Sequence, residues 1–349
     1  MVIMNNDVVT EILLHLPVQS LLRFRSVCKF WADVIDSRYF RKLYTQNNDN
    51  NKADDKVYLQ FSLSNGQIRV QHNQKSLISD ESDHFKGIGV GRVRLHGPVK
   101  GLICIECTNL GLPIAICNPL LGQLKHLPLI PNTSCTIICS SVGVGFDGDC
   151  KVVQLLSCKT HRCLHTHVYS GRTNSWRELN EHNGVLVDLQ LRYDNTIKSA
   201  CTNGYYAHWR VCRRKEGYAC SSEILSFDMK NEAFKTTVLP GEYARSKIFA
   251  EDEHSFRRFD IPDALFDNLV GIYELKCEEG KLSWHHVMNV NVPLYGIPRS
   301  TSTSVLFEQY MGTFVYDFRA RKFVSLLPKR SHIGSRTFEY RGSFVSLNA

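Results

Sequence analysis

The chain has 349 residues, of which 43% are hydrophobic and 22% are charged, and its formal net charge is +8. A chain of this length holds one large domain or two to three small ones, and this composition excludes intrinsic disorder. Its 13 cysteines lack regular spacing, which excludes a small disulfide-stapled fold and favours reduced thiols in an intracellular protein.

The first elements of the chain are predicted to be helices. From Asp7 to Leu16 apolar residues recur at helical spacing, and Asn5 or Asn6 can cap the helix. Pro17 ends this helix because its ring disfavours helical geometry at the residue before it. A second short helix carries Leu21, Leu22 and Phe24, and a third begins near Ser26 and carries Val27, Phe30, Trp31, Val34 and Ile35.

These helices carry more large apolar side chains than one core of about forty-five residues can hide. A partner protein that packs helix against helix on an apolar surface would explain the excess. The alternative is that the helices dock on a larger domain of the same chain.

Three short stretches carry a resemblance to a known family. Leu13–Pro17 reads LLHLP, Leu21–Phe24 reads LLRF and Val27–Trp31 reads VCKFW. In order and spacing they resemble the F-box, the helical motif that binds the Skp-type adaptor of SCF ubiquitin ligases. F-boxes commonly open with a Leu-Pro pair, where this chain has two asparagines. The resemblance implies a three-helix F-box over residues 1–45 with these adaptor-binding residues: Leu13, Leu16, Pro17, Leu21, Leu22, Val27, Cys28, Lys29, Trp31 and Ile35.

Residues 46–56, QNNDNNKADDK, are predicted to form a linker, because they are polar and have no periodicity. The period then changes to that of a strand, and apolar residues alternate with polar ones from Val57 to Leu63. Asn65 and Gly66 supply a turn, and the alternation resumes at Ile68, so a hairpin is predicted.

A weak repeat determines the expected architecture of the rest. A strand ends in a polar residue, and six residues later a large apolar residue opens a returning strand. The polar positions are Asn118, Ser170, Asp228 and Asp317, and the apolar ones are Leu124, Trp176, Phe234 and Phe323. Glu278 and Trp284 form a degenerate copy of the same pattern. With Glu278 included, the polar positions are 52, 58, 50 and 39 residues apart, an interval that suits four short strands per unit, as in a propeller blade. Further strands are predicted over residues 142–146, 151–156 and 204–211.

A β-propeller is favoured over a two-sheet β-sandwich, because the repeat is too long for single strands. The phrases Asn118-Pro119 and Ser175–Leu179 are similar to those of the F-box-associated, kelch-like repeat domain of plant F-box proteins. The expected fold class is α+β multidomain: a small N-terminal three-helix F-box, followed by an all-β kelch-like propeller over residues 57–349 that binds substrate.

The densest group of cysteines and histidines contains Cys158, His161, Cys163, His165 and His167. The last three would share one face of a strand, which is compatible with zinc, but an exposed polar strand face is favoured because a second ligand pair is missing. No catalytic residue, cofactor or metal is predicted.

Two further motifs have alternative interpretations. Cys104 and Cys107 have redox spacing but are surrounded by strands, so structural cysteines are favoured. The run from Trp209 to Lys215 mixes an aromatic residue with cations, which suits a nucleic acid, but a solvated loop is favoured. No nucleic-acid partner is therefore expected.

The resemblance implies a non-catalytic substrate receptor. Its helices would bind the Skp-type adaptor, and through it cullin and the RING subunit, while the propeller would bind a protein substrate for ubiquitination. Residues 101–128 resemble the S-locus F-box group of pollen, whose members recognise pistil S-RNases. Because those ribonucleases are basic, the net charge of +8 opposes such a partner. An F-box protein with an unrelated substrate, a propeller enzyme and an RNA-binding module remain alternatives.

Acidic loop tips are the candidate substrate contacts, namely Asp80, Glu81 and Asp83 in one segment and Glu251, Asp252 and Glu253 in another. The most apolar run, Gly101–Gly122, contains Glu106, Asn109 and Pro113, so no membrane partner is expected. The N-terminus lacks the pattern of a secretory signal. The expected location is the cytoplasm, with the nucleus as an alternative.

Overall fold

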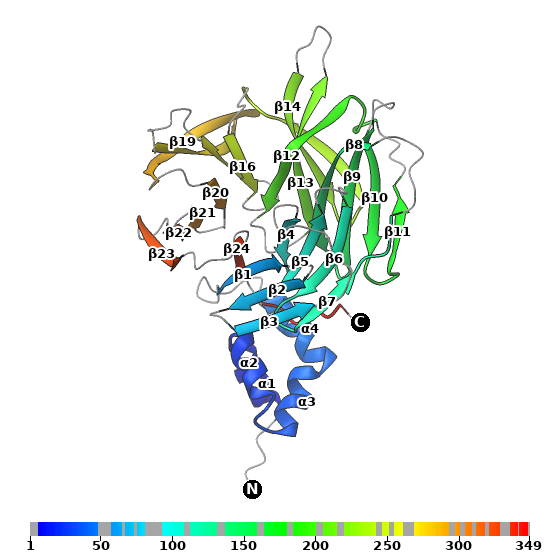
Figure 1. The fold of residues 1–349 in the computed structure, drawn as a ribbon, viewed down its shortest axis with the longest axis vertical. Coiled ribbons are helices and arrows are strands. Elements are labelled where there is room, and N and C mark those ends of the chain that lie inside the picture. The colour runs from blue at the N-terminus through cyan, green and yellow to red at the C-terminus, as the bar shows by residue number, and fades with distance from the viewer. Residues whose placement is uncertain are drawn as a thin grey trace.

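The computed structural model places four helices against one end of a β domain (Figure 1). The residues that it describes are 6–47, 57–64, 67–72, 75–80, 93–107, 112–130, 137–158, 164–179, 184–199, 205–214, 220–241, 246–250, 255–260, 269–292, 297–300, 304–308, 312–317, 321–328, 336–340 and 342–347. None of the helices in these ranges is long and apolar enough to cross a membrane.

The helices correct the expectation of three. They are α1 (Asn6–Leu14), α2 (Val18–Phe24), α3 (Lys29–Asp36) and α4 (Arg38–Asn47). Pro17 separates α1 from α2 as predicted, but α3 begins later than Ser26 because Cys28 is extended, with φ −159° and ψ 161°. The unexpected α4 begins after Ser37, whose hydroxyl accepts a hydrogen bond from the Phe40 N–H at 3.1 Å, and it includes residues 46 and 47, which were predicted to belong to the linker.

The β domain contains 24 strands in the described ranges. They are β1 (Val57–Ser64), β2 (Gln67–His72), β3 (Lys75–Asp80), β4 (Val93–Val99), β5 (Leu102–Cys107), β6 (Leu112–Asn118), β7 (Gln123–His126), β8 (Ile137–Phe146), β9 (Cys150–Cys158), β10 (Leu164–Ser170), β11 (Ser175–Glu178), β12 (Leu189–Ser199), β13 (Tyr206–Arg214), β14 (Cys220–Asp228), β15 (Ala233–Val238), β16 (Ser246–Ala250), β17 (Phe256–Asp260), β18 (Leu269–Glu278), β19 (Lys281–Asn291), β20 (Ile297–Ser300), β21 (Ser304–Glu308), β22 (Gly312–Asp317), β23 (Lys322–Pro328) and β24 (Arg336–Tyr340).

The strands are grouped in fours, as the repeat predicted. Three sheets follow the chain order, β4 to β7, β8 to β11 and β20 to β23, and a fourth has the order β24-β1-β2-β3. Two further groups, β12 to β15 and β16 to β19, merge into one eight-stranded sheet because the ends of β12 and β16 pair in parallel. This merger is a departure from separate blades, and it rests on only Lys198↔Phe249 and Ser199↔Ala250.

The repeated pattern corresponds to the last hairpin of a group. Its residues pair as Cys117↔Leu124, Tyr169↔Trp176, Phe227↔Phe234 and Tyr316↔Phe323. The polar position caps the turn: the Asp228 carboxylate, for example, accepts hydrogen bonds from the N–H groups of Lys230 and Asn231. The prediction that Glu278 and Trp284 repeat this pattern is wrong. A two-residue turn joins β18 to β19, and Trp284 pairs with Leu275.

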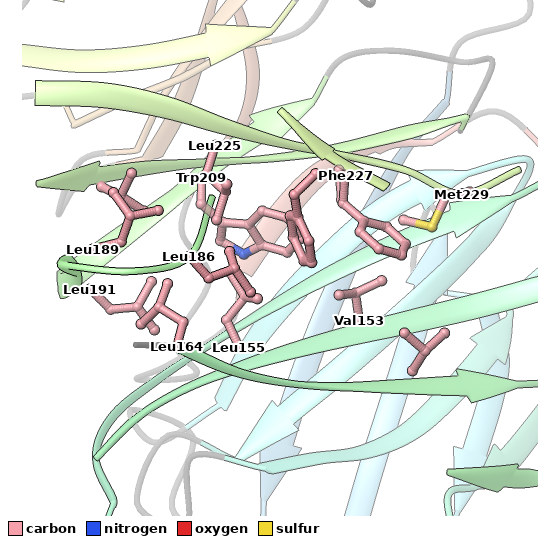
Figure 2. Packing of buried hydrophobic residues seen from close by; sticks show 14 residues of the cluster. Val153, Leu155, Leu164, Leu186, Leu189, Leu191, Trp209, Leu225, Phe227 and Met229 are labelled. Carbon is pink, nitrogen blue, oxygen red and sulfur yellow. The ribbon is translucent and has the colours of Figure 1, made fainter. Parts of the chain in front are cut away.

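The largest hydrophobic cluster joins two neighbouring sheets (Figure 2). Trp209 of β13 and Phe227 of β14 pack there together with Val153 and Leu155 of β9. Gly143 of β8 permits this close approach, since a Cβ at that position would lie 2.5 Å from the Trp209 ring. The sheets are thus held together by side chains that interlock across their faces.

Candidate protein-interaction surface

The four helices share a small buried core. Val9, Leu13, Leu21, Ile35, Phe40 and Tyr44 are each at most 2% exposed. The Tyr44 hydroxyl donates a hydrogen bond to the Leu16 carbonyl at 3.0 Å, which ties α4 to the end of α1. The Phe24 and Trp31 rings meet edge to face at 5.1 Å. This core fixes the helices relative to one another.

Large apolar side chains also lie on the outer surface of the helices. Of the eleven large hydrophobic residues that are exposed in the described part of the chain, five are in the helical segment. These five, the apolar helical surface, are Val8, Ile12, Val27, Phe30 and Tyr39. On α1, Val8 and Ile12 are half exposed while Val9 and Leu13 are buried, so this helix is apolar on two sides. Such a helix has one face more than its own core requires.

An ion-pair cluster ties the loop after α2 to α3 and α4. The Asp36 carboxylate accepts hydrogen bonds from the guanidinium groups of Arg25 and Arg41, both at 2.7 Å. Burial acts to raise the pKa of Asp36, but the hydrogen bonds and charges of the two arginines outweigh it and lower that pKa below its usual value. The cluster thus joins the loop that contains Val27 to the end of α3 and to α4.

The structure divides the predicted adaptor-binding residues into three groups. Leu13, Leu21 and Ile35 are buried in the helical core, and Leu16 and Trp31 pack partly buried against it. Pro17, Val27, Cys28 and Lys29 are exposed. Leu22 is in α2, and its side chain lies outside the described residues. The fully buried residues Leu13, Leu21 and Ile35 can shape a binding surface, but their side chains cannot touch a partner directly.

Sequence reasoning missed Val8, Ile12, Phe30 and Tyr39 as candidate contacts. The signal was present for α1, because apolar residues at positions 8, 9, 12 and 13 cover two sides of a helix. For Tyr39 there was no signal, because α4 was not predicted.

The opposite side of the helical segment docks on the β domain. Phe40 and Tyr44 contact Phe344, which follows β24, at ring distances of 6.5 and 5.3 Å. Leu120 and Leu121, from the turn between β6 and β7, pack against the same cluster. The interpretation that the helices dock on a larger domain of the same chain is therefore confirmed for this face, whereas a partner protein on the other face stays a prediction.

The end of the β domain that carries the helices, here called the near end, can be followed from sheet to sheet. Lys125 Nζ donates to the Gly171 carbonyl at 3.5 Å, and Lys151 Nζ donates to the Met229 carbonyl at 2.6 Å. The Met229 N–H in turn donates to the Tyr205 carbonyl at 2.8 Å, beside the start of β13. The turns after β6, β10 and β14, and the start of β13 with the end of β12 that pairs with it, thus belong to the near end.

Strand pairing locates the described residues that precede the two predicted acidic segments. Asp80 is the last residue of β3 and pairs with Ile68 at the start of β2. Ala250, which precedes Glu251, pairs with Ser199 at the end of β12, which is the near end. Glu81, Asp83, Glu251, Asp252 and Glu253 themselves lie outside the described residues, as does the Asp80 side chain.

The other motifs do not form sites in the described part of the chain. The exposed face expected around His167 is wrong, because His167 is 2% exposed and burial lowers its pKa. His161, Cys163 and the Cys158 side chain lie outside the described residues, and within them no group of three potential ligands could hold a metal. Cys104 and Cys107 are buried free thiols of β5.

The described residues of the run that begins at Trp209 do not form a solvated loop. Residues 206–214 form β13, and Trp209 is fully buried. Arg213 pairs with Glu223 at 2.9 Å, and Arg210 donates to the Ser222 hydroxyl at 3.0 Å. These cations stabilise contacts within the fold.

Comparison with known families defines the class of this protein. Residues 3–43 match the F-box domain, and residues 50–253, more than half of the chain, match the F-box associated beta propeller domain. The chain belongs to the plant F-box proteins that carry an F-box associated beta-propeller domain.

Individual relatives are F-box proteins of Arabidopsis thaliana. At1g47790 is 28% identical over 339 residues, which cover 88% of this chain and 80% of the relative. At3g10240 is 25% identical over 252 residues, 70% of this chain and 61% of the relative, and the F-box/kelch-repeat protein At3g23880 is 26% identical over 248 residues, 67% of this chain and 64% of the relative. The chain thus spans less than two thirds of the length of two of these three relatives.

Among solved structures, TolB from Acinetobacter baumannii is similar over 86% of this chain and 70% of its own, with 11% identity and a TM-score of 0.41. A likeness at this level supports no inference about function.

Proposed function

We propose that this protein is a substrate-recognition subunit of an SCF-type ubiquitin ligase. The helices bind a Skp-type adaptor, and through it cullin and the RING subunit, while the β domain binds a protein substrate. The subunit itself is non-catalytic, and it acts in the cytoplasm, with the nucleus as an alternative. Its mechanism is proximity, because a bound substrate is held at high effective concentration near the ubiquitin-transfer machinery.

The observation that supports this proposal best is the use of two faces by one small helical segment. One face is buried on the β domain through Phe40 and Tyr44, which leaves the segment fixed to the rest of the chain. The other retains the apolar helical surface, including Val27 at 62% and Tyr39 at 69% exposure. A partner helix laid on this surface would remove these side chains from water.

The β domain is proposed to act as a kelch-like propeller. Support comes from the groups of four strands and from the pairing of β24 with β1, which runs from Val57↔Tyr340 to Phe61↔Arg336. The proposed substrate contacts are the two acidic segments, one with Asp80, Glu81 and Asp83 and the other with Glu251, Asp252 and Glu253.

The class of substrate is a finer proposal. An S-RNase of the pistil, in pollen self-incompatibility, is supported by the resemblance of residues 101–128 to the S-locus F-box group. The net charge of +8 counts against such a basic partner unless acidic loops provide local attraction. An unrelated protein substrate of the same type of ligase is the alternative.

Affinity capture of the full chain from plant tissue, with and without proteasome inhibition, tests the proposal. We expect the Skp-type adaptor, cullin and the RING subunit in both samples, and substrate enriched only after inhibition. Recovery of RNA or of small-molecule products without the ligase subunits would instead support a nucleic-acid-binding module or an enzyme. That result would overturn the assignment.

A further inference from the structure

We infer that the segment Ser343–Leu347, here called the strut, fixes the orientation of the helices on the β domain, with Phe344 as its contact residue. The strut follows β24 and lies at the near end, between the helices and the turn that joins β6 to β7. Its consequence for ubiquitin transfer rests on the proposed function: the strut would set the distance between the adaptor and the bound substrate.

The β domain holds the strut by its backbone. The Asn118 amide donates hydrogen bonds to the carbonyls of Ser343 at 3.1 Å and of Val345 at 2.8 Å. Gln123 accepts a bond from the Leu347 N–H at 2.9 Å. The side chains of Val345 and Leu347 pack into the hydrophobic cluster formed by the sheets β4 to β7 and β8 to β11. Hydrogen bonds to a buried amide and apolar packing together make this a specific seat.

The position of the β domain that lies directly against Ser343 requires a glycine. Gly101 has a φ of +71°, which other residues rarely adopt. A Cβ there would lie 2.8 Å from the Ser343 backbone nitrogen, closer than such contacts allow. The Ser343 hydroxyl also donates a hydrogen bond to the neighbouring Lys100 carbonyl. The turn between β4 and β5 is thus shaped to receive the strut.

Phe344 points the other way, toward the helices. It is 3% exposed, and its ring lies edge to face against Tyr44 at 5.3 Å. The Arg41 guanidinium carbon lies 5.9 Å from the centre of the same ring. Phe344 therefore packs against α4, while Val345 and Leu347 pack within the β domain, and the strut joins the two bodies.

Without such a contact, two domains on one chain are expected to move relative to each other. Among the described residues, the other large β-domain side chains that pack against the helices are mainly Leu120 and Leu121. Loss of the Phe344 ring should therefore release the helices without unfolding either body.

The test is a distance measurement on the free full chain, so that it does not depend on adaptor or substrate. Exposed Cys28 on the helices and exposed Cys277 on β18 accept spin labels. The half-buried Cys139 and the cysteines whose side chains are not described are replaced by serine in this background, namely Cys135, Cys158, Cys163, Cys201 and Cys220. Pulsed electron–electron double resonance then gives the distribution of distances between the two spin labels.

We expect one narrow distance peak for the parent chain and its loss in Phe344→Ala, with partial restoration in Phe344→Leu. Val345→Ala is the matched control, because it removes packing within the β domain only and should lower the melting temperature while keeping the peak narrow. If Phe344→Ala does not fold, Leu121→Ala carries the test, since it weakens the same boundary from a turn. An unchanged peak in Phe344→Ala or Leu121→Ala, or equal broadening in Val345→Ala, would overturn the inference. Because no adaptor is present, that outcome is distinct from failure of the ligase assignment.

Discussion

At the scale of single residues, Asp36 illustrates how one carboxylate organises the loop that presents Val27. It accepts hydrogen bonds from Arg25 and Arg41 and thereby joins the loop after α2 to α3 and α4. Its side chain is 35% exposed, so solvent screens the pairs and each contributes at most about 1 kcal/mol. The cluster nevertheless joins the loop that contains Val27, a residue of the apolar helical surface, to α3 and α4.

The lowered pKa of Asp36 predicts a pH dependence of helix stability. Because the folded-state pKa lies below the unfolded one, the stabilisation is complete above the unfolded pKa and is lost as the pH falls through the folded pKa. At about pH 6, the free energy of unfolding of Asp36→Asn should be lower than that of the parent by up to about 1 kcal/mol. When the pH falls from about 6 to about 3, this free energy should decrease less in Asp36→Asn than in the parent. Urea unfolding followed by the helical circular dichroism signal measures this. Asp33→Asn, at an exposed position of the same helix, is the control, and an identical pH slope for Asp36→Asn and the parent would contradict the prediction.

The sequence patterns predicted which apolar positions the helical segment requires. They did not predict whether each position belongs to the core or to an exposed contact surface. Leu21 and Ile35 were expected to touch the adaptor, yet both are fully buried. A motif records that a position must be apolar, but the reason can be an internal core or an external contact. Only the packing of α4 shows which side of each helix is already covered.

At the scale of elements, hairpins and glycines decide how the sheets form and stack. The six-residue offset between Tyr169-Ser170 and Trp176 follows from a four-residue turn, after which Tyr169 and Trp176 pair and their rings contact at 5.4 Å. This spacing is local, so it could be predicted from sequence. The parallel pair β12–β16 joins residues about fifty apart through two residue pairs only, and it leaves no local signal.

The glycines of β8 give a prediction about stacking between sheets. Gly143→Ala should lower the free energy of unfolding by about 1–3 kcal/mol, because the added methyl group meets the rigid Trp209 ring and Ala207. Gly145→Ala should cost less, because the atoms that it meets belong to the flexible side chain of Met229. Urea denaturation followed by tryptophan fluorescence compares the two variants. Gly143→Ala at parental stability, or a larger cost for Gly145→Ala, would contradict this explanation.

At the scale of the whole molecule, the helices lie at one end, and most of the β domain extends away from them (Figure 1). They dock on the β domain through Phe40, Tyr44 and Phe344. The order of domains and the grouping of strands in fours could be predicted from the sequence, because both depend on periodicity. The docking of the helices could not, because it depends on Phe344, about 300 residues from α4, and contacts so distant along the chain leave no periodic signal.

The central claim is that the apolar helical surface binds the Skp-type adaptor, and an affinity titration with purified adaptor tests it most directly. Val27→Asp and Phe30→Ala should each raise Kd by about tenfold or more while the melting temperature stays at the parental value, because exposed side chains carry contact energy but little core packing. Leu21→Ala should lower the melting temperature by several degrees, because it opens a cavity in the helical core. Val238→Asp, a similarly exposed valine on β15, is the matched control and should leave Kd unchanged. Parental affinity in both Val27→Asp and Phe30→Ala would contradict the claim.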